Sequence, residues 1–592
     1  MTETLTYSTL KQIVWDFADK IRDQGNGEVS DYLPITIGTL ILKRLIDERT
    51  EFKKQLLEKM KSGEIVTRNL DEYMRHNRNI RPEIAIKKDA LWTWRMDWED
   101  IAKFSDNTDG NYNIRQYMDI DGTYLTDTHE GIRQAYPAIE CVADYSVPED
   151  IHPQIYNNIE LVHYLSRNFE NPVYEELFEI FNFTSKIGNK NNNEKTNESI
   201  VLDSKVYSQI LNSLIGVDFS VKSAPHHVFA DVYMNLLERF AEDGGKKGGE
   251  FFTPQDIVHG AIKFLDIQDA VNKNYISVCD ITSGACSSVI EMANQFVQYK
   301  LALDPEANEN ELREKVDIIT GEKNIRSGAI GKANVALHDY QNHIHYDKNS
   351  ILEYNEGLGN YQHTIDFAFA NPPYGLKDYG ESYAQAHHDE ALWAYGVPKK
   401  GDGDYAFMEI LLSMLNDTGK AVIVLPMGTL FKNTTKNIRK NLLDTGWIEG
   451  IIALPGNLFR TTSIPVCIWV INKNRQDQHL ITEDNNKPGV MLINAVNDFD
   501  ADGKFNRWSD VHSDHAYDVF KEKRDIEGYS RYVDFKTIED NDFNLSIDKY
   551  IDSDEPEEAI DIDKLEDDIS KLQNELFGDL IDLTKTFMSV KE

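Results

Sequence analysis

Between residues 250 and 475, short apolar runs alternate with longer stretches of helical character. This alternation is the pattern expected for a parallel sheet covered by helices. The runs expected to form strands are residues 276–280, 316–322, 364–370, 421–425, 449–454 and 466–471. We therefore predict an α/β domain in this part of the chain, in which ligands bind beyond the carboxyl ends of the strands.

Both flanks of this domain carry helical patterns. Between residues 8 and 50, apolar residues recur at intervals of three and four, which is the stripe of amphipathic helices. Near the C-terminus, a similar spacing predicts a long helix that either binds a partner or packs back on its own domain. Its apolar positions are Ile562, Leu565, Ile569, Leu572, Leu576, Leu580, Leu583 and Phe587.

A polar segment at residues 475–490 marks a loop or a boundary after the last predicted strand. We therefore divide the chain into an N-terminal, mainly helical domain at 1–220, the α/β domain at 221–475, and a C-terminal region at 476–592 that ends in the long helix.

The net charge of −38 limits how this chain can meet nucleic acid. It argues against a protein that grips duplex DNA by itself, because phosphate neutralisation by Lys and Arg supplies most of the nonspecific affinity. Two local basic clusters are either contacts to a polyanion or solvated faces. They are Arg75, Arg78, Arg81, Lys87 and Lys88, and Lys432, Lys436, Arg439 and Lys440.

Cysteine usage and the N-terminal sequence indicate a cytoplasmic protein. The four cysteines, Cys141, Cys279, Cys286 and Cys467, show neither metal-ligand spacing nor the density of a disulfide scaffold, so we expect reduced thiols and no metal. The first residues lack a basic stretch followed by an apolar run, and no segment of eighteen or more apolar residues occurs, so we expect no membrane association.

The string DFAFANPPY at residues 366–374 is the most informative in the chain, because a predicted strand runs directly into Asn371, Pro372, Pro373 and Tyr374. The two prolines fix two φ angles and remove two N–H donors, so the turn offers acceptors without competing donors. The Asn371 side-chain oxygen and the Pro372 carbonyl could accept both hydrogens of a planar amino group, and Tyr374 could stack on a flipped base. The alternative is a plain loop, but the position at a strand end favours a site.

This motif and several others resemble those of the modification subunits of type I restriction-modification systems, a branch of the S-adenosylmethionine-dependent amino methyltransferases. The N-terminal helices with Trp15, Ala18 and Arg22 also resemble that family, so the likeness covers nearly the whole chain. The other matching segments are GGEFFTPQ at 248–255, DYAF at 404–407, GKAVIVLP at 419–426, LPGNLF at 454–459, IPVCIWVINK at 464–473 and DFNLSIDKY at 542–550. The resemblance implies a Rossmann-like methyltransferase fold for the α/β domain.

The same resemblance implies which residues bind the cofactor, S-adenosylmethionine. Those expected to line its methionine end are Glu250, Phe251, Phe252, Thr253, Pro254 and Gln255. Those expected in the loop after the first strand are Asp280, Gly284, Ala285, Cys286 and Ser287. Glu322 is expected to accept the ribose hydroxyls, and Asn349 to contact the adenine of the cofactor.

The loop after the first strand departs from the family pattern. Ile281 replaces the usual Pro, and Cys286 and Ser287 stand where at least one further Gly is usual, so their side chains could crowd the cofactor. We expect weakened rather than abolished binding. The alternative is a catalytically silent scaffold subunit.

The resemblance implies direct, in-line methyl transfer to the N6 atom of an adenine flipped out of DNA, without a metal or a covalent nucleophile. Cytosine N4 and a protein amide are alternative acceptors. The implied partners are DNA, a specificity subunit flanked by two modification subunits, and a restriction subunit that joins some complexes. Only about 117 residues follow Arg475, which leaves no room for two target-recognition domains.

Overall fold

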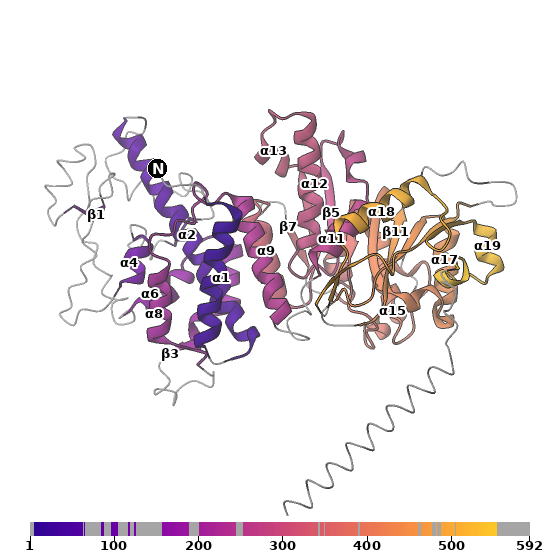
Figure 1. Ribbon diagram of the computed structural model, residues 1–592, viewed down its shortest axis with the longest axis horizontal. Helices are drawn as coiled ribbons and strands as arrows, with labels where there is room; N and C mark the ends of the chain where they lie inside the picture. Colours follow the sequence, from indigo (N-terminus) through magenta and orange to yellow (C-terminus); the bar gives the residue numbers. More distant parts are fainter. Residues whose placement is uncertain are drawn as a thin grey trace, which may run out of the picture.

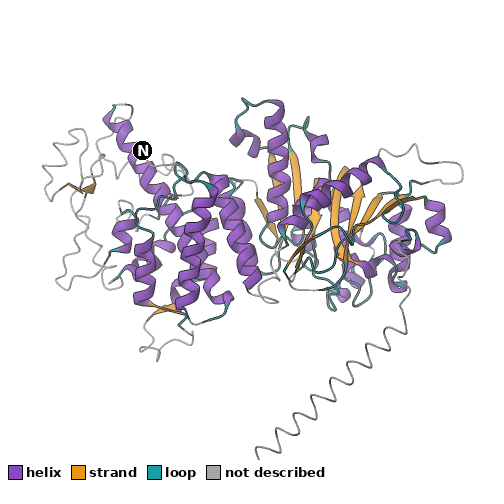
Figure 2. Cartoon of the chain, in the orientation of Figure 1, coloured by secondary structure: helices purple, strands orange, loops and turns teal. Residues whose placement is uncertain are grey.

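The computed structural model describes residues 5–25, 27–62, 64, 84–87, 96–104, 117–118, 124–125, 157–188, 200–243, 253–340, 344–347, 350–388, 391–459, 463–475, 481, 487–503 and 505–552. In this part of the chain, a group of helices lies beside a domain built on a large sheet (Figures 1 and 2). No helix among these residues is long and apolar enough to cross a membrane.

The N-terminal helices bury the stripe that the sequence predicts. Helix α1 begins after Thr6, whose hydroxyl caps the Thr9 N–H, and it buries Leu10, Val14 and Phe17. The helices of this domain are α1 (Tyr7–Gln24), α2 (Val29–Lys61), α4 (Trp98–Ala102), α6 (Asn158–Ser166), α7 (Pro172–Phe181), α8 (Ser204–Ser213) and α9 (His226–Asp243). Two-residue strands are β1 (Tyr117–Met118), β2 (Tyr124–Leu125), β3 (Ile187–Gly188) and β4 (Leu202–Asp203).

Helix α9 belongs to the same apolar core as α1, and in Figure 1 it lies between the other N-terminal helices and the sheet domain. The helical domain therefore extends beyond residue 220, where we expected it to end. Helix α14 (Ile325–Leu337) of the sheet domain packs against α7 and α9, and Lys332 on α14 pairs with Glu176 on α7 at 2.6 Å.

The sheet of the second domain contains all the predicted strands and three more. Its strands are β5 (Ile276–Asp280), β6 (Val316–Gly321), β7 (Ile344–Asp347), β8 (Ile365–Ala370), β9 (Leu415–Pro426), β10 (Ile448–Ala453), β11 (Val466–Asn472), β12 (Val490–Asn494) and β15 (Ser530–Val533). A small hairpin joins β13 (Asp500–Asp502) to β14 (Phe505–Arg507). The other helices are α11 (Gln255–Lys263), α12 (Ser287–Leu303), α13 (Glu309–Arg313), α15 (Glu381–Ala386), α16 (Asp404–Met414), α17 (Lys436–Asp444), α18 (Asp510–Glu522) and α19 (Phe535–Asp540).

The sheet is mixed rather than wholly parallel. The strand order is β15-β12-β10-β11-β9-β8-β5-β6-β7, and the pairs from β7 to β9 are parallel. Strand β11 runs antiparallel to both of its neighbours, and β15 runs antiparallel to β12. The described residues between β10 and β11 form no helix, whereas a parallel pair needs a long crossover connection, so the short link favours the antiparallel arrangement.

Two apolar cores lie on opposite faces of the sheet, because successive side chains of a strand point to opposite sides. Phe367 and Phe369 enter the core formed with α11, α12 and α18, whereas Ala368 and Ala370 enter the core formed with α16 and α17. The described cysteines, Cys279, Cys286 and Cys467, are buried free thiols.

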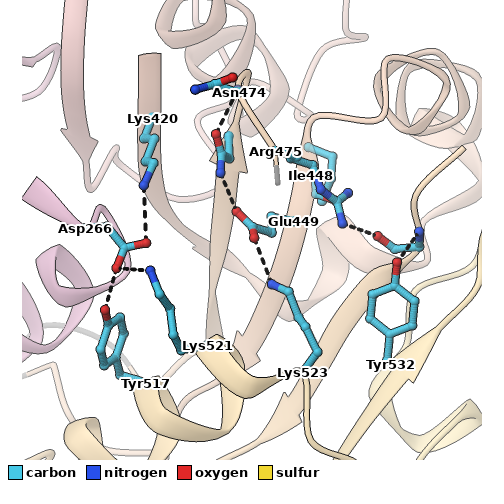
Figure 3. A network of polar contacts seen from close by, with 12 residues as sticks. Asp266, Lys420, Ile448, Glu449, Asn474, Arg475, Tyr517, Lys521, Lys523 and Tyr532 are labelled. Carbon is cyan, nitrogen blue, oxygen red and sulfur yellow. Dashed lines mark hydrogen bonds and ion pairs between the residues drawn. The ribbon is translucent and has the colours of Figure 1, made fainter. Parts of the chain in front are cut away.

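Residues beyond 475 complete this domain. Strand β12 lies inside the sheet, and α18 is joined to the strands by the polar network of Figure 3. In that network Asp266 accepts from Lys420 at 3.2 Å and pairs with Lys521 at 2.7 Å, and Lys523 pairs with Glu449 at 2.8 Å. The α/β domain therefore continues past our expected boundary at 475, whereas the predicted helix around Ile562 lies outside the described residues.

Candidate active site

The carboxyl ends of β5, β6 and β8 meet at one cavity of about 850 Å³. Because these three strands are parallel neighbours, the loops that follow them converge at the same edge of the sheet. The cavity is lined by Asp280 at the end of β5, by Gly284 in the loop that follows, and by Glu322 after β6. It is also lined by residues 371–374 after β8, which we call the Asn371 turn. Thus it joins the acceptor motif to the residues expected to hold the cofactor.

The side chain of Asn371 is hydrogen bonded at both ends of its amide. Its Nδ2 atom donates to Thr253 Oγ1 at 3.0 Å, and its Oδ1 atom accepts from the Tyr374 hydroxyl at 2.5 Å. Burial raises the pKa of Tyr374 well above its usual value, which keeps this hydroxyl a donor. The Tyr374 ring meets Phe459 edge to face, with ring centroids 6.0 Å apart.

Asp404 holds the chain immediately after the Asn371 turn. The Gly375 N–H donates to Asp404 Oδ1 at 3.1 Å, and Gly375 has a φ of 61° that favours glycine. Asp404 is buried at the start of α16, and burial raises the pKa of its carboxyl group. The DYAF segment at 404–407 thus has a structural reason to accompany the turn, although its sequence showed only that it follows the turn.

Asp280 is buried at the end of β5, where it organises the loop that follows. Its carboxylate accepts from the Thr282 N–H at 2.8 Å and from the Ser288 hydroxyl. Burial, followed by the nearby charge of Glu322, raises the pKa of Asp280 to about 7, against the hydrogen bonds that lower it.

Glu322 joins the loops after β5 and β6. Its Oε2 atom accepts from the Gly284 N–H at 2.9 Å, and its Oε1 atom accepts from the Asn324 N–H at 2.6 Å. Burial raises the pKa of this carboxyl group. With a backbone hydrogen bond from Lys323 as well, three of the four lone pairs of the carboxylate are used, so Glu322 can still accept a hydroxyl group from the cavity. Gly284 has a φ of 50°, which lets the loop turn close to that space.

The unusual residues of this loop do not all face the cavity. Cys286 is fully buried with a φ of 63°, and its Sγ atom would lie 2.6 Å from a Cβ at Gly331 of α14. Its thiol therefore occupies space that Gly331 leaves open. We had expected this side chain to crowd the cofactor, but it does not line the cavity. Ile281, Ala285 and Ser287 do line the cavity.

The remaining expected site residues fall into two groups. The first group is described by the structure: Thr253 lines the cavity, whereas Pro254, Gln255 and Cys286 do not. Glu250, Phe251, Phe252 and Asn349 lie outside the described residues. The cavity is also lined by residues that sequence reasoning missed, among them Lys323 and Asn324 directly after Glu322, Ser350 directly after Asn349, and the half-exposed Leu352 and Ile464. Proximity to a predicted site residue was the signal available for the first three.

Most side chains of the second basic cluster, at residues 432–440, make contacts within the protein. Arg439 is buried and donates to the carbonyl oxygens of Phe543, Thr429 and Lys432. Lys432 and Lys436 pair with Asp402 and Asp542, respectively. Of the first cluster only Lys87 is described, and it pairs with Glu175 at 2.5 Å.

The residues around the cavity fit S-adenosylmethionine. The carboxylate of Glu322 can accept from ribose hydroxyls, and Gly284 permits a close approach of the backbone. Gly321 must lack a side chain, because a Cβ there would lie 2.9 Å from the Ile281 carbonyl oxygen. The Asn371 amide lies across the same cavity, where an acceptor group could meet a bound methyl donor.

Residues 224–559 match the family model described as N-6 DNA Methylase. The type I restriction enzyme MjaVII methylase subunit of Methanocaldococcus jannaschii is 28% identical over 69% of this chain and 69% of its own length. The MpnII methylase subunit of Mycoplasma pneumoniae is 25% identical over 75% of this chain and 83% of its own length.

The fold agrees with a crystal structure of a type I restriction-modification system methyltransferase subunit from Streptococcus thermophilus. The TM-score is 0.61 at 22% identity, over 93% of this chain and all (100%) of that one. The matched family model covers more than half of the chain, including every strand of the large sheet. The chain therefore belongs to the N-6 DNA methylase family and is an S-adenosylmethionine-dependent adenine-N6 DNA methyltransferase of the type I restriction-modification class.

Proposed function

We propose that Asn371 and Pro372 bind the amino group of the target adenine through their side-chain and backbone oxygens, and that Tyr374 stacks on the flipped base. The observation that carries this proposal is the cavity shared by the Asn371 turn and the ends of β5 and β6. Accepting both amino hydrogens concentrates electron density on N6, which makes it a better nucleophile. Pro373 keeps the turn rigid and presents no N–H to compete for those acceptors.

In this proposal Asp280, Gly284 and Glu322 hold S-adenosylmethionine, which supplies the methyl group when bound. Glu322 orients the ribose through its remaining lone pair, and Gly284 allows the backbone to lie close to the ligand. Ala285 and Ser287 form further walls of the same space. Catalysis comes from the positioning of the two reactants and from the acceptors placed at the amino group, and no covalent nucleophile is required.

We further propose that this chain modifies DNA as part of a complex, in which two copies flank one specificity subunit and a restriction subunit can join. The net charge of −38 and the internal pairing of Lys432 and Lys436 support a need for partners that supply DNA contacts. The MjaVII and MpnII relatives are both named as methylase subunits of type I restriction enzymes, which supports membership of a larger complex.

The experiment is to purify the full chain with its native partners and to sequence DNA after incubation with S-adenosylmethionine. We expect methylation at adenine N6, whereas methylation at cytosine N4 would contradict the adenine assignment. Asn371→Ala should lower the transfer rate by about a hundredfold or more, because an acceptor at the nucleophile is lost. Calorimetry should give the same cofactor affinity for both proteins, and absence of binding to the wild type would favour a scaffold.

A further inference from the structure

We infer that Thr253 is a positioning residue, which sets the orientation of the Asn371 amide so that its oxygen, and not its NH2 group, faces the target base. This inference rests on the proposed function of Asn371. It departs from the role that family resemblance implies for Thr253, which is contact with the methionine end of the cofactor.

Orientation matters because the two ends of a side-chain amide have nearly the same shape but opposite hydrogen-bonding character. The oxygen accepts from an amino group, whereas the NH2 end would direct two donors at it. A half-turn of the Asn371 amide would therefore remove the proposed acceptor without changing the volume of the side chain.

Two hydroxyl groups hold the observed orientation from opposite ends. Thr253 Oγ1 accepts from Nδ2 at 3.0 Å, and the Tyr374 hydroxyl donates to Oδ1 at 2.5 Å. Reversal would place the NH2 group against Tyr374 and the oxygen against Thr253, and both hydroxyls would have to reverse their roles. Because an amide oxygen has two lone pairs, Oδ1 retains one for an incoming amino hydrogen.

The backbone at Thr253 is anchored independently of the Asn371 turn. The next residue, Pro254, is the N-cap of α11, and its carbonyl oxygen accepts from the N–H groups of Ile257 at 3.0 Å and Val258 at 3.1 Å. Helix α11 packs against α12 and α18, in the core on one face of the sheet. The hydrogen bond to Thr253 thus links the Asn371 amide to a packed helix, although 118 positions of sequence separate the two residues.

The test compares Thr253→Val, which removes the acceptor at nearly constant volume, with Thr253→Ser, which keeps it. With the full chain and its native partners, we expect the valine variant to lower kcat about tenfold, the effect of one lost orienting hydrogen bond. The serine variant should stay within about twofold of wild type, and calorimetry should give all three proteins the same cofactor affinity. Thermal melts establish that each variant is folded.

A second arm separates orientation from general structure by using Asn371→Asp, because a carboxylate has two equivalent oxygens and cannot be presented the wrong way round. Thr253→Val should cost about tenfold in the wild-type background but less than about threefold in the Asn371→Asp background. A merely structural role would lower both backgrounds equally, which would overturn the inference.

Two other results would also overturn it. An unchanged kcat in Thr253→Val would show that the hydroxyl does not orient the amide. Weaker cofactor binding with an unchanged kcat would show that Thr253 contacts the cofactor instead. Absence of adenine methylation by the wild-type complex would instead refute the proposed function itself, and the inference would fall with it.

Discussion

Asn334, buried on α14, donates its side-chain Nδ2 to the carbonyl oxygen of Ala285 in the loop after β5, at 2.7 Å. The same Nδ2 atom lies 2.7 Å from the Sδ atom of Met234 on α9. One side chain therefore contacts both the loop at the cofactor cavity and a helix of the N-terminal domain. Ala285 is also part of the apolar core of that helical domain. The loop is thus supported by the packing of the two domains against each other.

Asn334→Ala should weaken binding of S-adenosylmethionine several-fold, because the Ala285 carbonyl loses its buried donor and the loop loses a fixed point. Leaving a buried acceptor without a partner costs about 1–3 kcal/mol. Titration calorimetry on the full chain measures the effect. The matched control is Lys332→Ala on the same helix, whose partly exposed ion pair with Glu176 contributes little. Equal cofactor affinity in Asn334→Ala and wild type would show that the loop does not depend on this contact.

Gly331→Ala should also weaken cofactor binding, through a steric effect on the same loop. A Cβ at Gly331 would lie 2.6 Å from Cys286 Sγ and 2.8 Å from the Gly284 carbonyl oxygen, and the second contact is with backbone. The loop would have to move toward the cavity, and overpacking of this kind typically costs about 1–3 kcal/mol. Gly456→Ala is the control, because a Cβ there would meet no atom within 4 Å. Calorimetry should distinguish the two variants, and identical affinities would contradict the role of Gly331.

The interior of the sheet could be predicted from sequence because its strands are apolar on both faces, as a buried sheet requires. Strands β7 and β15 have four residues each, too few to show a distinct pattern in the sequence, so both were missed. Strand β12 was missed for another reason. It is buried along its whole length, but it follows a polar segment that we interpreted as a domain boundary. Local polarity identifies a loop and does not reveal whether the chain returns to the same sheet.

The site shows the same division between local and tertiary information. The position of Asn371 at a strand end follows from neighbouring residues, so it could be predicted. Its bond to Thr253 and the bond from Gly375 to Asp404 depend on how distant elements pack, and no local pattern encodes them. The direction of the Cys286 side chain depends on a positive φ, which residue type does not reveal for a cysteine.

A chain that ends at residue 475 should fail to form a stable α/β domain. It would lack β12, which pairs with β10 inside the sheet, and α18 together with Lys523 directly after it, which pairs with the partly buried Glu449. Exposing the edge of β10 would leave unpaired backbone groups and promote aggregation. Expression followed by size-exclusion chromatography compares this chain with one that ends at residue 552, which keeps the whole described sheet. A monodisperse, cooperatively melting chain of 475 residues would restore the boundary that the sequence suggested.

Glu409→Gln should stabilise the protein in alkaline solution. Glu409 is buried on α16, where its Oε2 atom accepts from the Tyr395 N–H at 3.3 Å and its Oε1 atom has no partner among the described residues. Burial raises the pKa of this carboxyl group from 4.5 to about 8. The folded state therefore holds a proton that the unfolded chain releases, so stability falls as the pH rises from about 4.5 to about 8 and then levels off.

Glutamine keeps the shape of the protonated acid and has no proton to lose, so its advantage over glutamate should grow with pH. Between pH ~5.5 and pH ~9, we expect that advantage to increase by on the order of 3 kcal/mol, since one pKa unit corresponds to about 1.4 kcal/mol. Denaturant midpoints of the two proteins at both pH values measure it. Glu306→Gln, at an exposed position, should show no such trend. If the Glu409→Gln and wild-type stabilities changed in parallel with pH, Glu409 would be ionised in the folded protein and would need a compensating donor beside its Oε1 atom.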